Sequence, residues 1–141
     1  MSARSKARKR ALDILFESDS KGVPIAGVLA EHVRRRRDEG SPPLNDFTVF
    51  LVEGVAGHLN EIDQSIGTHA QGWSLDRMPD VDRALARLAT FEILFADDVP
   101  DAVAISEAVN LAAELSTEES PTFLAGVLNA IAAPTGEVEP E

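Results

Sequence analysis

Hydrophobic residues along the 141-residue chain recur every three to four positions, which predicts helices. Residues 79–96 are the most apolar of them. At about 100° per residue, their polar side chains form one narrow stripe, and hydrophobic residues cover most of the remaining circumference. A helix that is apolar nearly all round is buried, so we predict that the other helices pack around residues 79–96.

One carboxylate interrupts the apolar surface of this central helix. Glu92 projects between Leu85 and Leu88, where a lone charge would be costly and needs a partner. In the first predicted helix, Arg8 also lies on the apolar side, between Leu12 and Leu15. We therefore predict a buried, structural ion pair between Arg8 and Glu92.

The same spacing predicts the other helices. They cover residues 3–19, 24–37, a long stretch from Asn45 or Asp46 to Ile66, residues 102–115, and a last helix that Ser116 and Glu119 would open as a capping box. No useful stretch alternates with period two, so the fold class is all-α with about seven helices. Trp73, in a link, is interpreted as a packing anchor rather than a stacking platform.

Charge is distributed unevenly along the chain. Residues 1–37 carry ten Lys and Arg against four acids, and the remainder carries three against 20, which divides the net charge of −11 into +6 and −17. A basic end beside an acidic body suggests a polyanion as one partner and a cationic protein as another. Two merely solvated faces are the alternative.

Two groups of cations are candidates for nucleic-acid contact. Arg4, Lys6, Lys9 and Arg10 crowd the start of the first helix, where the helix dipole disfavours them, so phosphate binding explains them better than helix stability does. A solvated terminus is the alternative. The second group, residues 34–37, is interpreted first as favourable charge at a helix C-terminus and second as a nucleic-acid contact.

Several function classes are excluded by what the sequence lacks. It has no cysteine, no glycine-rich phosphate loop, no nucleophile elbow and no cluster of metal ligands, so we expect no enzyme, cofactor or metal site. No apolar run is long enough to span a bilayer, and the basic start lacks the apolar segment of a secretory signal. A soluble cytoplasmic protein is expected.

The order of several short motifs resembles the NusB family of transcription antitermination factors. The motifs include Ala7-Arg8, Leu15-Phe16, Val52–Val55, Asp82–Glu92, Val99-Pro100, Val103–Val109 and Glu118–Leu128, in one register over residues 4–131. The resemblance implies one all-helical domain over residues 1–133, with an N-terminal subdomain of about residues 3–70 packed on a C-terminal subdomain of about 74–133. Residues 134–141 are expected to form a disordered acidic tail.

The resemblance also implies a function. Family members bind the boxA element of nascent ribosomal RNA transcripts together with the ribosomal protein NusE. The complex joins RNA polymerase with other Nus factors and prevents premature termination, and members occur as monomers and as homodimers.

By the same resemblance, RNA contacts fall on Arg4, Lys6, Lys9 or Arg10, and Phe16, and NusE contacts on Asp82, Leu115, Glu119 and Phe123. Phe16 stands where the family more often has tyrosine. Leu115, Ala125 and Asn129 also depart from the usual pattern. Two alternatives remain: an RNA-binding domain related to that of ribosomal RNA cytosine methyltransferases, and a helical scaffold that binds no RNA.

Overall fold

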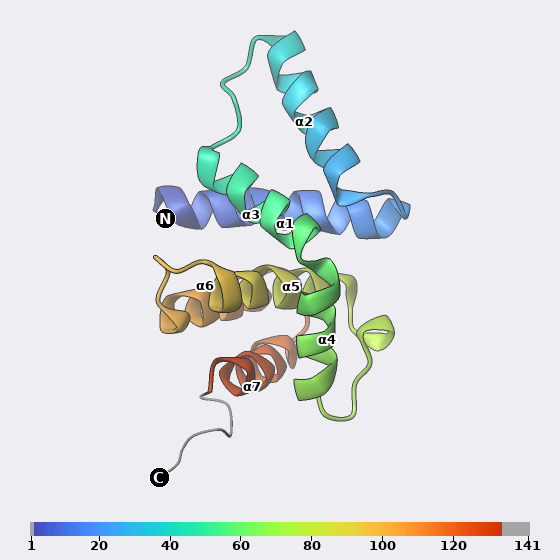
Figure 1. Ribbon diagram of the computed structural model, residues 1–141, viewed down its shortest axis with the longest axis vertical. Helices are drawn as coiled ribbons and strands as arrows, with labels where there is room; N and C mark the ends of the chain where they lie inside the picture. The colour runs from blue at the N-terminus through green and yellow to red at the C-terminus, as the bar shows by residue number, and fades with distance from the viewer. Residues whose placement is uncertain (1, 134–141) are drawn as a thin grey trace.

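The computed structural model describes residues 2–133, and within this range the chain is all-helical, which confirms the predicted fold class (Figure 1). The elements are α1 (Ala3–Lys21), α2 (Ile25–Glu39), α3 (Asp46–Gly57), α4 (Leu59–His69), a short 3-10 helix η1 (Leu75–Arg77), α5 (Asp80–Phe95), α6 (Asp101–Leu115) and α7 (Ser120–Ala132). The predicted acidic tail, residues 134–141, lies outside the described residues.

Helix α5 lies at the centre of the molecule, as its sequence predicted. It packs against α1, α3, α4, α6 and α7. Nine of its residues are buried, including Leu85, Leu88 and Phe91. Burial of this apolar surface against five other helices contributes hydrophobic stabilisation to their packing.

The helices form two groups (Figure 1). Helices α1, α2 and α3 lie together at one end, and α2 leans away so that its last turn forms the tip of the molecule. Helix α4 packs against α5 and α7, so it belongs with the C-terminal helices. The change in packing partners therefore falls between α3 and α4.

The predicted long helix from Asn45 to Ile66 is wrong in one respect, because the structure divides it at His58. The backbone of His58 has φ −125° and ψ 23°, outside the helical range, although its N–H still bonds the Gly54 carbonyl at 3.1 Å. Gly57, a weak helix former, precedes the break. The bend lets α3 pack on α1 and α5 while α4 reaches α7.

A close approach between α3 and α5 depends on Gly54. A Cβ atom added there would lie 2.1 Å from the Phe91 ring, well inside van der Waals contact. Phe91 is 3% exposed, so its ring is enclosed by neighbouring side chains. A glycine is therefore required at this helix crossing.

Arg8 of α1 and Glu92 of α5 lie together in the core. The Arg8 Nη2 atom is 2.8 Å from Glu92 Oε2, and Arg8 Nε donates to both carboxylate oxygens at 3.0 and 3.1 Å. The two residues are 4% and 1% exposed. These bonds compensate the cost of removing both charges from water and fix α1 against α5.

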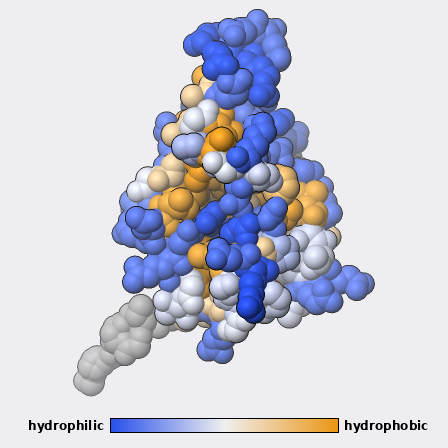
Figure 2. All heavy atoms as spheres, turned by 90° about the vertical axis from the view of Figure 1, so that its right-hand side faces the viewer, coloured by the Kyte–Doolittle hydropathy of each residue, from blue (hydrophilic) through white to orange (hydrophobic). Residues whose placement is uncertain are grey.

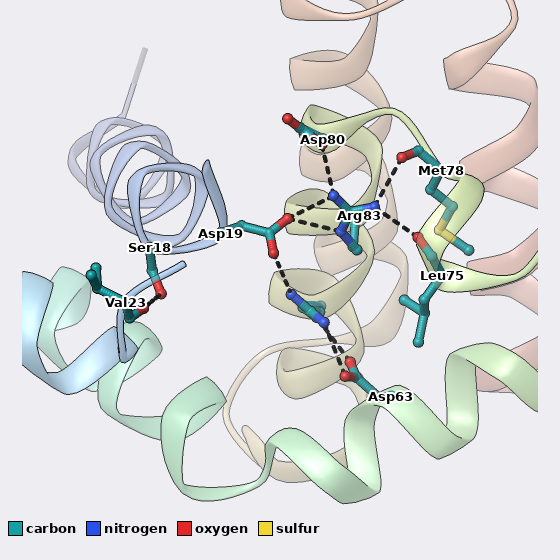
Figure 3. A network of polar contacts seen from close by, with 9 residues as sticks. Ser18, Asp19, Val23, Asp63, Leu75, Met78, Asp80 and Arg83 are labelled. Carbon is teal, nitrogen blue, oxygen red and sulfur yellow. Dashed lines mark hydrogen bonds and ion pairs between the residues drawn. The ribbon is translucent and has the colours of Figure 1, made fainter. Parts of the chain in front are cut away.

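A second polar contact joins the other end of α1 to α5 and α4 (Figure 3). Arg83 donates to Asp19 of α1 at 2.8 Å and to Asp80 at 2.7 Å. Arg87 binds the two oxygens of Asp63 in α4 at 2.9 and 3.0 Å. The narrow polar stripe of the central helix is thus covered by partners from two other helices.

Glu17 joins the C-terminal half of α1 to α2. Its carboxylate lies 2.8 Å from His32 Nε2 and accepts from Lys21 Nζ at 2.9 Å. The hydrogen bond from His32, followed by that from Lys21, lowers the pKa of Glu17 from 4.5 to about 2.

We expect Arg8→Ala to lower the free energy of unfolding by about 3–5 kcal/mol, because it leaves the Glu92 carboxylate buried without a partner. Denaturant unfolding measures the change. Glu107→Gln is a matched control, since Glu107 is 24% exposed and lies 3.6 Å from Arg8; its effect should stay below about 1 kcal/mol. Equal effects of the two substitutions would contradict a structural role for the buried pair.

We expect Glu17→Gln to lower the melting temperature at about pH 6 and to have a progressively smaller effect in acid. The folded-state pKa is depressed, so the stabilisation is present above pH 4.5 and is lost as the pH falls towards about 2. Thermal melts of both proteins across this range test it, with the exposed Glu118→Gln as control. A difference that does not change with pH would exclude ionisation of Glu17 as its cause.

Candidate nucleic-acid interface

The basic segment at the N-terminus is a regular helix. The Ser2 side chain caps α1 by accepting the Ser5 N–H at 3.0 Å. Farther along, Ala7, Ala11 and Ile14 are buried against the rest of the molecule. The cap and this packing hold the first turns helical despite the cations at the positive end of the helix dipole.

Three of the predicted RNA-contact residues share the outer face of α1. Lys6 and Arg10 are exposed and lie one turn apart, and Lys9 beside them is partly buried. Phe16 is 38% exposed, on the same helix beyond Arg10. Lys6 forms no ion pair with any residue in the range 2–133, and Arg10 lies 3.6 Å from Asp13.

Arg4 does not lie on this face. At about 100° per residue it is about 160° around the helix from Lys6. Its guanidinium pairs with Asp98 at 3.0 Å and lies 4.1 Å from the centroid of the Phe47 ring. Lys9 is also paired, with Glu114 at 2.7 Å. All four members of these two ion pairs are more than a third exposed, so the pairs are weak and exchange readily.

The predicted protein-partner residues lie at the junction of α5, α6 and α7. Asp82 is only 3% exposed, although it is among the residues that line a hollow at this junction. Its two carboxylate oxygens accept from Ser116 at 2.5 Å and Ser120 at 2.8 Å. Asp82 therefore orders the turn between α6 and α7 from beneath.

The same geometry corrects the predicted capping box. Ser116 ends α6, and its hydroxyl is directed to Asp82 instead of the Glu119 backbone. Helix α7 begins at Ser120, three residues later than a cap at Ser116 predicts, and the Glu119 side chain makes no capping bond. The long-range hydrogen bonds to Asp82 replace the local pair that sequence spacing suggested.

The hollow at this junction has a volume of about 430 Å³. Phe123 and Glu119 line it, and Leu115, 40% exposed, lies on the last turn of α6. Trp73 and Met78 also line this hollow, although no sequence pattern indicated a partner contact at either residue. Trp73 is 49% exposed and contacts Phe123 edge to face, with ring centroids 5.9 Å apart. It packs as predicted yet leaves half its surface available to a partner.

Over residues 2–133, no group of three or more potential metal-ligating side chains is brought together. In the same part of the chain, no helix is long and apolar enough to cross a membrane.

Comparison with known proteins agrees with the resemblance. The profile of the NusB family matches residues 5–133. The transcription antitermination protein NusB of Beutenbergia cavernae is 55% identical over 136 residues, covering 91% of this chain and 88% of that protein. The NusB of Salinispora tropica is 54% identical over 132 residues, covering 94% and 96%.

Solved structures show the same fold. T. maritima NusB superimposes with a TM-score of 0.79 at 32% identity, covering 93% of this chain and 91% of that one. A crystal structure of the antitermination factors NusB and NusE in complex with double-stranded RNA contains a chain with a TM-score of 0.76 at 26% identity, covering 92% and 95%.

Proposed function

The chain belongs to the NusB family, and from this premise we propose that it is a transcription antitermination factor that binds boxA of nascent ribosomal RNA together with NusE. The names of its relatives describe a role in transcription and no chemical reaction. They favour this function over a domain of a ribosomal RNA cytosine methyltransferase. The complex would act in the cytoplasm and join RNA polymerase and other Nus factors.

The observation that carries the RNA-binding proposal is the basic outer face of α1. Lys6, Lys9 and Arg10 present three cations there, and RNA phosphates would replace the weak pair between Lys9 and Glu114. Phe16 offers an exposed ring for an unstacked base. Arg4 would contact the RNA only if its ion pair with Asp98 broke.

The surface around the hollow at α6 and α7 supports the proposed NusE contact. It combines exposed apolar groups with acids, and the chain from residue 38 onward carries a net charge of −17. An acidic surface suits a basic ribosomal protein. Asn129 and Ala125 both depart from the family pattern. The Asn129 side-chain amide donates a hydrogen bond to the Ala125 carbonyl, one turn earlier in α7, at 2.7 Å.

The oligomeric state would then affect function. In a homodimer that covers the outer face of α1, the second copy of the chain and the RNA would compete for the same cations. We propose that in the RNA-bound form no second copy covers this face.

For the RNA contact, we expect Lys6→Ala and Arg10→Ala each to weaken boxA binding by about 1 kcal/mol, roughly fivefold in Kd, through loss of a phosphate contact. Fluorescence anisotropy with boxA and scrambled RNA at several salt concentrations measures this. Lys21→Ala removes the same charge at the far end of α1 and is the control. Lack of any preference for boxA in the unmodified protein would contradict the proposed function.

For the protein contact, we expect NusE to raise boxA affinity and Phe123→Ala to reduce that gain by about 2 kcal/mol, because a packed aromatic anchor is lost. RNA binding without NusE should not change. Leu94→Ala, which removes an exposed apolar side chain outside the hollow, is the control. If NusE binds the Phe123→Ala protein as tightly as the unmodified one, the proposed surface is wrong.

A further inference from the structure

The run of four arginines at the end of α2, residues 34–37, has no role in the contacts described so far. Two of the carbonyls at the end of the helix already accept hydrogen bonds from backbone N–H groups. Gly40, in the left-handed region at φ 69°, donates to the Arg37 carbonyl, and Ser41 donates to that of Arg36 at 2.9 Å. The Arg36 side chain donates instead to the Pro42 carbonyl at 2.9 Å. Hydrogen-bond capping by the arginine side chains therefore does not account for the run.

The four side chains divide between two sides of α2. Arg34 and Arg37 line a hollow between α2 and α3, whose other walls are mainly apolar. Arg35 and Arg36 line a different hollow of about 390 Å³, on the side of α1, which Arg10 also lines. The remaining lining residues of this second hollow are His32, Glu39, Ser41 and Pro42.

The two pairs of arginines also differ in their partners. Arg34 pairs with Glu31, and Arg37 lies 3.9 Å from Asp38. Neither Arg35 nor Arg36 forms an ion pair with any residue that the structure describes. Three arginines thus line one hollow, and Glu39 is the single acidic residue among its lining residues. Of the three, Arg10 lies 3.6 Å from Asp13.

Such a gathering of like charge repels itself and favours an anion. The hollow is predominantly polar, and guanidinium forks match the oxygens of a phosphate. The tip of the molecule, where α2 ends, is hydrophilic on the face that Figure 2 shows, so an apolar partner has little to contact there.

We propose that the hollow between Arg10, Arg35 and Arg36 is a second phosphate-binding site, which continues the RNA path from α1 to the end of α2. Arg10 joins the two sites, because it lies one turn from Lys6 on the outer face of α1 and also lines the hollow. The inference rests on the proposed RNA-binding function. The contact is to the RNA backbone, so it adds affinity and leaves the preference for boxA unchanged.

The test is the salt dependence of RNA binding by the full chain, with boxA RNA that carries flanking nucleotides on both sides. Arg35→Ala/Arg36→Ala removes two phosphate contacts, so the slope of log K against log salt becomes less negative by about 1.4, at about 0.7 per contact. When salt is raised from about 50 to about 200 mM, the ratio of the affinity of the unmodified protein to that of the variant should fall by about sevenfold.

Arg34→Ala/Arg37→Ala is the matched control, because it removes the same charge from the same turns of α2 on the other side of the helix. Its slope should stay near that of the unmodified protein. Melting curves of both double variants check that α2 remains folded.

Equal slopes for the two double variants would overturn the proposal, as would weaker binding of the ternary complex with NusE but unchanged binding of RNA alone. The same assay separates this result from failure of the proposed function. If the protein binds boxA and scrambled RNA equally, the antitermination role is contradicted. The phosphate-binding role of the hollow is still tested in that case, by the change in the slope of log K against log salt. A protein that binds neither RNA contradicts both.

Discussion

The buried ion pair between Arg8 and Glu92 is the interaction on which the arrangement of this molecule depends. It places a charged residue of the basic helix α1 against the last turn of α5, with both side chains almost fully removed from water. A charge pair in the core has one favourable geometry, since any displacement leaves an uncompensated charge. The basic face of α1 is therefore presented at a fixed orientation on a rigid support.

The pair does not act alone. Asp19 lies 11 residues beyond Arg8 on α1, about 16 Å along the helix, and it contacts Arg83 and Arg87 of α5 (Figure 3). Helix α1 is thus held near both ends by polar contacts to the same helix, with apolar packing between them. Arg87 extends the contact to α4 through Asp63.

The uneven charge of the chain has a structural counterpart. Acids of the C-terminal half reach back to cations of α1, as in the pairs of Arg4 with Asp98 and Lys9 with Glu114. These exposed pairs moderate repulsion among the cations without burying them. Lys6, Arg35 and Arg36 form no such pair with a residue in the range 2–133 and keep their full charge for a partner. Cations of α1 and α2 thereby remain available for the polyanion that we propose as a partner.

The sequence by itself determined the helical fold, the central position of α5 and the need for a partner at Glu92. Each of these follows from the spacing of hydrophobic residues along one segment, or from the cost of burying a charge without a partner. Tertiary structure decided what depends on distant residues. The bend at His58 follows from what α3 and α4 each pack against, and Asp82 is buried because Ser116 and Ser120 reach it from across a turn. The division of four consecutive arginines between two hollows was likewise invisible in the sequence, since it depends on where α1 and α3 lie beside α2.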